Sequence, residues 1–131
     1  MRLLLTVLLV LLMITSAQGG SVNINTMMME ATCKIVGPGS SGSGFILGTP
    51  NPTDPKTYFY TLVTAHHVLQ AIQGDRATLV LRRLVDRDKQ EYQRVEAPVE
   101  IRKDGNAMWS KHPEVDLAAM FISLPVGAAP I

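Results

Sequence analysis

The sequence predicts an all-β domain, and three observations favour that class. Runs of apolar, β-branched and aromatic residues recur along the chain, separated by segments rich in Gly, Pro, Asp and Asn. The 3.6-residue periodicity of amphipathic helices is nearly absent. The composition, with 47% hydrophobic and 18% charged residues, is that of a packed protein and not of a disordered chain. A length of 131 residues fits one domain or part of a larger one.

Six segments have the composition of β-strands, because each is rich in apolar and β-forming residues. They are residues 31–36, 43–48, 57–63, 76–85, 91–102 and 117–122. Short connections favour antiparallel pairing, and closure into a barrel, complete or nearly so, would remove exposed sheet edges. We therefore expect a barrel of six antiparallel strands over residues 31–124.

The segments between the strands have the chemistry of turns, since Gly, Pro, Asp and Asn allow backbone angles that strands rarely adopt. Turns and loops are expected at residues 37–42, 49–56, 86–89 and 104–106. Residues 67–73 have the pattern of a short helix closed by Gly74. Pro98 has no N–H to donate and predicts a bend in the fifth strand. Residues 125–131 have the composition of a linker.

The first 17 residues have the pattern of a secretory signal peptide. Arg2 precedes the apolar run Leu3 to Ile14, and the small residues Thr15 to Ala17 follow where a signal peptidase would cut. The run is shorter than the roughly 20 apolar residues of a membrane-spanning helix. We expect cleavage near Ala17 and an exported protein, secreted or periplasmic, with no membrane span after cleavage; an uncleaved anchor is the alternative. Residues 18–30 are expected as a flexible N-terminal arm, in which Met27, Met28 and Met29 have no assigned role.

Charge and cysteine content exclude several classes of function. Twelve basic and eleven acidic residues give a net charge of +1, so the chain has no broad basic surface for nucleic acid. The basic residues between positions 82 and 94 interleave with acidic ones, which predicts a solvated hairpin face. The single cysteine, Cys33, rules out an intrachain disulfide and any site of several thiolates. It is either buried, which we favour, or available to another chain.

Three motifs occur in an order that points to a known family. They are Gly42-Ser43-Gly44-Phe45, then Thr64-Ala65-His66-His67 at the end of an apolar strand, then His112-Pro113 followed by Asp116-Leu117-Ala118. This set resembles the trypsin-like serine peptidases of the chymotrypsin fold, particularly the cysteine-poor bacterial type. The resemblance covers about residues 31–125. It implies a six-stranded antiparallel Greek-key barrel, the first half of a chymotrypsin-like double barrel, acting on polypeptide substrates without a cofactor.

The resemblance assigns His67 as the general base and Asp116 as the carboxylate that orients it. An imidazole at the end of a buried strand is held at a cleft edge, and a carboxylate opening another strand can accept its N–H and fix the tautomer. Matching Thr64-Ala65 to the motif selects His67, with His66 as the alternative. Asp116 can also be a strand-start carboxylate held by turn N–H groups. His112 is expected as a surface loop residue.

No nucleophile is identified in the chain. The family carries its G-x-S-G turn, oxyanion-hole amides and specificity pocket in a second barrel, and nothing after Asp116 matches them. Ser41 lies within a G-x-S-G sequence, but it precedes the histidine and matches the first hairpin, so we do not assign it as the nucleophile. A metal site built from the three histidines and Asp116 is disfavoured, because adjacent side chains diverge and Pro113 interrupts the second group.

Two functions follow from these observations. The first is an exported serine endopeptidase represented by its N-terminal half, which is predicted to be inactive without the half that carries the nucleophile. The second is a non-catalytic one-barrel module that binds a protein partner. In either case the partner is a polypeptide: a substrate, the missing second barrel or another protein.

Overall fold

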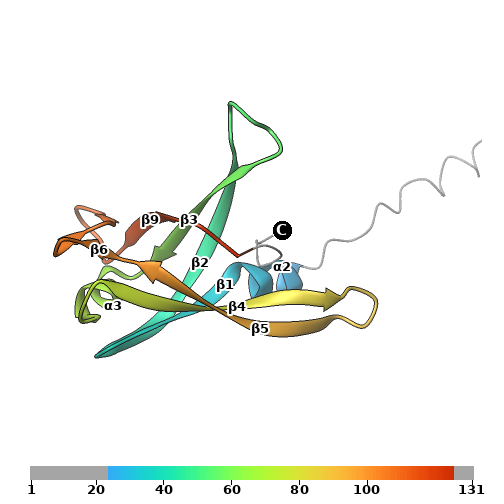
Figure 1. The fold of residues 1–131 in the computed structure, drawn as a ribbon, viewed down its shortest axis with the longest axis horizontal. Coiled ribbons are helices and arrows are strands. Elements are labelled where there is room, and N and C mark those ends of the chain that lie inside the picture. The colour runs from blue at the N-terminus through green and yellow to red at the C-terminus, as the bar shows by residue number, and fades with distance from the viewer. Residues whose placement is uncertain (1–23, 126–131) are drawn as a thin grey trace, which may run out of the picture.

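The computed structural model describes residues 24–125, which form an all-β domain with two short helices. Seven antiparallel strands make one sheet in the order β5-β4-β1-β2-β3-β9-β8, and β6 and β7 form a separate pair (Figure 1). The all-β class predicted from the sequence is confirmed. The elements are α2 (Ile24–Ala31), β1 (Thr32–Gly37), β2 (Ser40–Pro50), β3 (Tyr58–Thr64), α3 (His66–Ala71), β4 (Arg76–Asp86), β5 (Glu91–Glu100), β6 (Arg102–Lys103), β7 (Asn106–Ala107), β8 (Ser110–Lys111) and β9 (Ala118–Ile122).

The seven-stranded sheet is open, so the expected closed barrel of six strands is wrong. Its two edges are β5 and β8. The strand expected at residues 91–102 stops at Glu100, and the chain continues into the β6–β7 hairpin. The second neighbour of β9 is β8, which pairs with Ala118 and Ala119. Strands as short as β8 have no periodicity that a sequence can show, which is why they were not predicted.

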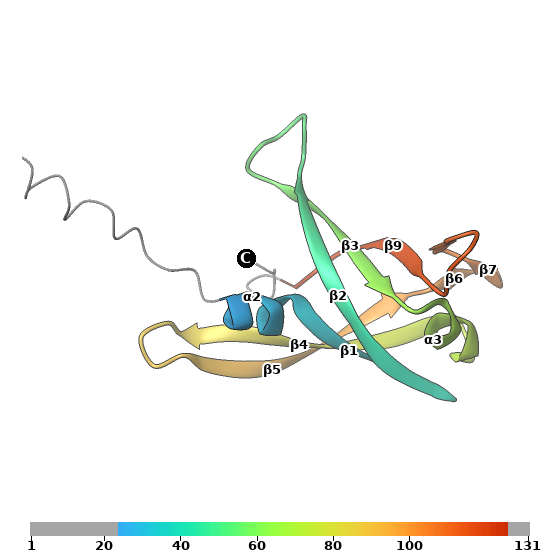
Figure 2. The ribbon, with the colours of Figure 1, turned by 180° about the vertical axis from the view of Figure 1, so that it is seen from behind.

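Strand β2 joins the two halves of the sheet. Its first part pairs with β1 from Ser40 to Phe45, and its second part pairs with β3 from Gly44 to Pro50. The β2–β3 hairpin and the β4–β5 hairpin therefore project in different directions from the centre (Figure 1, Figure 2). The turn expected at residues 37–42 is shorter than predicted, because β2 already begins at Ser40.

The second part of the arm expected to be flexible at residues 18–30 instead forms helix α2. The Arg82 guanidinium donates to the Met29 carbonyl at 3.1 Å, and the Tyr92 hydroxyl donates to the Glu30 carboxylate at 2.7 Å. These contacts attach the helix to the β4–β5 hairpin. The predicted signal peptide, the start of the arm and residues 126–131 of the predicted linker lie outside the described residues. Among residues 24–125, no helix is long and apolar enough to cross a membrane.

At Pro98, where the sequence predicts a bend, the strand pairing shows no irregularity. The register between β4 and β5 continues through the Thr78–Pro98 pair, and the irregularity lies between Leu84 and Asp86. Because β5 is an edge strand, it tolerates a residue that lacks an N–H.

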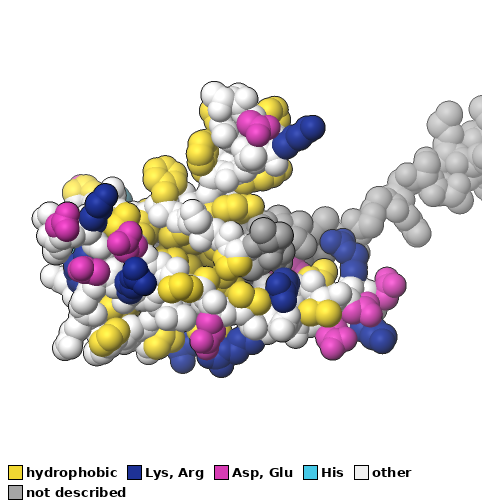
Figure 3. All heavy atoms as spheres, viewed as in Figure 1, with side chains coloured by type: hydrophobic (Ala, Val, Ile, Leu, Met, Phe, Trp, Pro, Cys, Tyr) yellow, Lys and Arg dark blue, Asp and Glu magenta, His cyan; other side chains and the backbone are white. Residues whose placement is uncertain are grey.

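The core lies between the two halves of the sheet and α3. Hydrophobic side chains gather between the two hairpins, whereas charged side chains lie mostly at the ends and along one edge (Figure 3). On the β4–β5 hairpin, Arg94 donates to Glu96 at 2.6 Å, in keeping with the expected solvated face. The largest fully buried side chains are Ile35, Leu62, Leu69, Ile72, Leu79 and Ile101.

The thiol of Cys33 is part of this core, with 3% of the residue exposed, so the predicted burial is confirmed. Burial raises the pKa of the Cys33 thiol to about 11, and a hydrogen bond from the Gly44 backbone partly offsets the rise.

We expect Cys33 in the native protein to resist alkylation by iodoacetamide at pH 8 and to react fully in urea. Mass spectrometry reports on this one thiol directly, and rapid labelling of the native protein would contradict its burial.

Candidate active site

The turn from β3 into α3 carries two histidines, of which His67 is exposed and His66 is half-buried. The last residue of β3, Thr64, is buried and donates its hydroxyl to the Ser43 carbonyl at 2.9 Å. Ala65 is extended, with φ −66° and ψ 135°, and α3 begins at His66. The strand end is thus fixed to β2, and the His67 side chain just beyond it is 71% exposed.

Asp116 accepts two hydrogen bonds from His67, which lies 49 residues earlier in the sequence. Its Oδ1 accepts the His67 backbone N–H at 2.9 Å, and its Oδ2 contacts His67 Nδ1 at 2.5 Å. An ionised carboxylate can only accept, so Nδ1 carries a proton, and in the neutral imidazole the lone pair lies on Nε2. The structure thus brings together His67 and Asp116, and the contact involves His67 and not His66.

These two hydrogen bonds favour the ionised form of Asp116. The pKa of Asp116 lies below its ordinary value of 3.8, first because the His67 side chain donates to it and second because the His67 backbone N–H does. The side chains of His67 and Asp116 are 71% and 52% exposed. An ion pair exposed to this extent contributes little to stability. The contact therefore depends on how the two segments are placed.

Helix α3 is placed by unusually close packing on the β1–β2 hairpin. A Cβ added at Gly42 would lie 2.6 Å from Val68 Cγ2, and one added at Gly37 would lie 2.5 Å from Ile72 Cγ2. Val68 lies on α3 and Ile72 is the residue that directly follows the helix, and both are buried. The presence of glycine at position 42, the first of the G-S-G-F motif, thus has a structural reason, because it lets the helix that carries the histidines approach β2.

Arg102 and Trp109 also contact α3, and neither is among the candidate residues predicted from the sequence. The Arg102 guanidinium donates to the carbonyl oxygens at the C-terminal end of the helix, where they would otherwise lack partners. These bonds are to Ile72 at 2.7 Å, Gly74 at 2.6 Å, Leu69 at 3.2 Å and Gln70 at 3.3 Å. Arg102 also lies 5.1 Å from the Trp109 ring centroid, and Trp109 Nε1 donates to His66 Nδ1 at 3.1 Å. His66 is thus used in packing the helix.

The remaining candidate residues do not join His67. Ser41 pairs with Val36 in the β1–β2 ladder. Between residues 24 and 125, His67 has hydrogen bonds to Asp116 but none to a hydroxyl or thiol. The same part of the chain contains no cluster of three or more His, Cys, Asp or Glu side chains that could hold a metal ion. The exposed loop that carries Asp116 also contains His112, whose ring accepts two backbone hydrogen bonds.

A comparison with known proteins identifies no relative: no family model, no curated protein and no solved structure matches the chain.

The packing of α3 can be tested with Gly42→Ala. The added methyl group collides with Val68, so we expect a loss of about 1–3 kcal/mol in the free energy of unfolding. Val68→Ala in the same protein should reduce that loss, and urea denaturation of both single variants and the double variant measures the coupling. Gly48→Ala on the same strand is the matched control, because its nearest neighbour is a Tyr60 ring atom at 3.3 Å. If Gly42→Ala lowers the free energy of unfolding equally in the wild-type protein and in the Val68→Ala variant, the proposed contact is contradicted.

The hydrogen bonds to Asp116 can be tested by titration. The pKa of Asp116 is lowered in the folded protein. The contribution of these hydrogen bonds to stability is therefore present above the ordinary pKa of 3.8 and is lost as the pH falls through the pKa of the folded protein. The carboxyl ¹³C chemical shift of Asp116 should therefore titrate with a midpoint below 3.8. His67→Phe removes the larger cause but keeps the backbone N–H, so the midpoint should rise without returning fully. His66→Gln should change it much less, and an equal rise in both variants would contradict the assignment.

Proposed function

We propose that this chain carries the general base and the orienting carboxylate of an exported trypsin-like serine endopeptidase, as its N-terminal half. The observation that carries the proposal is the contact of 2.5 Å between His67 Nδ1 and Asp116 Oδ2. It fixes the tautomer in which Nε2 is the basic nitrogen, and the 71% exposed side chain leaves that nitrogen accessible to a second reacting group. Both residues lie in motifs that resemble the family.

In this reaction, His67 Nε2 takes the proton of a serine hydroxyl as the oxygen attacks the peptide carbonyl. Asp116 stabilises the imidazolium that forms, and His67 then returns the proton to the leaving amine. The described residues supply the base and its partner but no hydroxyl bonded to the base. The serine and the oxyanion-hole donors would come from a second barrel encoded after residue 131.

The strand order supports this architecture. The run β4-β1-β2-β3 has the spatial order 4-1-2-3 of a Greek key, with β5 and β9 flanking it. We propose that these six longer strands correspond to the first barrel of the family, opened here between β5 and β9.

An exposed apolar surface also supports a second folded unit. Phe45 and Leu47 on β2 are 45% and 50% exposed, and Phe121 on β9 is 78% exposed. Leu47 pairs with Thr61, which pairs with Phe121, so these side chains lie on one face of the sheet. Exposed apolar patches of this kind are typical of surfaces that another protein unit covers.

The chain by itself should have no peptidase activity, because triad members act as a unit and substrate binding needs the other half. Purified protein should not hydrolyse casein and should not react with a fluorophosphonate probe, which labels activated serines. Labelling that persists in His67→Ala would indicate a contaminating enzyme. Labelling that is lost in His67→Ala would show a nucleophile within these residues and contradict the division into halves.

The stronger test uses the coding sequence beyond residue 131. The proposal requires a downstream G-x-S-G motif, and Asp116→Asn in the complete protein should lower kcat by about 10⁴-fold, the effect known for the orienting carboxylate of the triad. Glu96→Gln, which neutralises an exposed carboxylate on β5, is the matched control and should leave kcat unchanged. A loss of less than tenfold in Asp116→Asn would contradict the role of Asp116.

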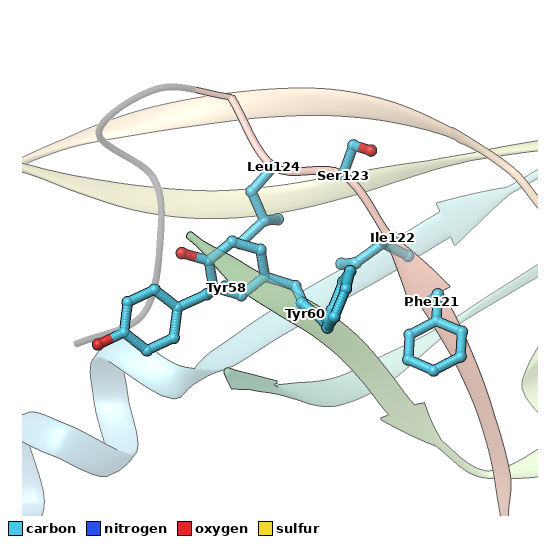
Figure 4. Close-up of a pocket in the computed structure, with 7 residues that line it drawn as sticks. Tyr58, Tyr60, Phe121, Ile122, Ser123 and Leu124 are labelled. Carbon is cyan, nitrogen blue, oxygen red and sulfur yellow. The ribbon is translucent and has the colours of Figure 1, made fainter. Parts of the chain in front are cut away.

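A non-catalytic binding module is the second candidate, and one observation favours it. A hollow at the start of β3 is lined by aromatic and aliphatic side chains from β3 and from residues 121–124 (Figure 4). The Tyr58 and Tyr60 rings stack there with centroids 6.4 Å apart. The hollow lies at the opposite end of β3 from His67, so it would bind a partner without the His67–Asp116 pair. A stop codon directly after residue 131, with no G-x-S-G downstream, would favour this function.

A further inference from the structure

The loop that presents Asp116 is organised by a second histidine. It connects Lys111 at the end of β8 to Ala118 at the start of β9. Within it, His112 Nδ1 accepts the backbone N–H of Glu114 at 3.1 Å and that of Val115 at 3.2 Å. Two hydrogen bonds from one loop to a single ring nitrogen fix the ring and the loop relative to each other.

We propose that His112 is a positioning residue that holds Asp116 in reach of His67. As a statement about catalysis this rests on the proposed function, whereas as a statement about geometry it stands on the hydrogen bonds of the loop. His112 touches neither His67 nor the expected reacting atoms, and it acts through the backbone on both sides of Asp116.

The backbone of the loop is fixed on either side of Asp116. The N–H of Leu117 donates to the Val115 carbonyl at 2.8 Å, and the N–H of His112 donates to the Leu117 carbonyl at 2.8 Å. With the Val115 N–H held by the His112 ring, the residues that precede and follow Asp116 are both tied to His112.

Burial does not replace this arrangement, because the Asp116 side chain is 52% exposed. Its carboxylate accepts two hydrogen bonds from His67, and the backbone of the loop brings it within reach of them. Pro113 has no N–H, so the first two donors after His112 are those of Glu114 and Val115, which are the two that its ring accepts.

The same pattern is made elsewhere in the chain by a carboxylate. Asp86 Oδ1 accepts the N–H of Asp88 at 2.9 Å and that of Lys89 at 3.1 Å, two and three residues later. The His112 ring nitrogen thus takes the place of an Asp or Asn oxygen in this type of turn. An asparagine at position 112 can supply a similar acceptor, whereas a leucine of comparable size cannot.

The proposal predicts opposite tautomers for two histidines of the site. His112 Nδ1 accepts two hydrogen bonds, so its ring proton lies on Nε2, whereas the ring proton of His67 lies on Nδ1. The ¹⁵N chemical shifts of the ring nitrogens distinguish the two forms in the unmodified chain. A neutral His112 with its proton on Nδ1 would overturn the proposal without any variant.

Substitution at position 112 supplies the second test. In His112→Leu we expect the Asp116 titration midpoint to rise toward that of His67→Phe and the Nδ1–H form of His67 to lose population, while His112→Asn preserves both. Amide spectra of the core strands show whether each variant is folded. The positioning role would be overturned if the Asp116 midpoint and the His67 tautomer population were unchanged in a folded His112→Leu protein. It would also be overturned if both quantities changed equally in His112→Leu and His112→Asn.

In the complete protein, His112→Leu should lower kcat by up to about 10²-fold with little change in KM, and His112→Asn should restore most of it. These outcomes separate the two proposals. If the complete protein has no peptidase activity while the spectra change as expected, the proposed function fails and the positioning role stands. If the protein is an active peptidase and His112→Leu leaves kcat unchanged, the positioning role fails.

Discussion

The placement of α3 is the constraint on which the candidate site depends. A helix of six residues is too short to be stable in water by itself, so its position is set by what it packs against. Gly42 lets Val68 of the helix approach the β1–β2 hairpin, Gly37 does the same for Ile72 directly after the helix, and Arg102 supplies donors for the carbonyls at this end. His67 lies on the first turn of this helix, so its position follows from packing contacts made by residues other than His67 and Asp116.

The His67–Asp116 contact is therefore a result of the fold and contributes little to holding it. Both side chains are more than half exposed, and pairs of this kind add little to the free energy of unfolding. Each partner is held by its own scaffold, His67 by α3 and Asp116 by the loop around His112. Such an arrangement can keep its geometry when salt weakens the electrostatic attraction, because the geometry does not depend on that attraction.

The parts of the structure that the sequence predicts are those with local causes. The strand expected at residues 57–63 is observed at 58–64, and the helix expected at 67–73 is observed at 66–71, followed by Gly74 with φ +84°. The failures have causes distant in the sequence. The free edge of β9 pairs with β8 and not with β5, and no local sequence pattern indicates this pairing. The contacts of Arg82 and Tyr92 with α2 span 53 and 62 residues, and Trp109 reaches His66 across 43. His112 had a local signal, since Pro113 removes one donor and leaves the next two free for its ring.

The chemistry available to His67 depends on what comes to lie against Nε2. Most of the His67 side chain lies in water, and Asp116 fixes the tautomer of its ring. A second unit packed beside it would exclude water, lower the local dielectric constant and strengthen the interaction of Asp116 with a protonated His67. In the proposed function, the unit that brings the serine also produces this change. A site whose base and carboxylate are already oriented requires no further rearrangement of these two residues, so the binding energy of the second unit can act on the nucleophile and the substrate.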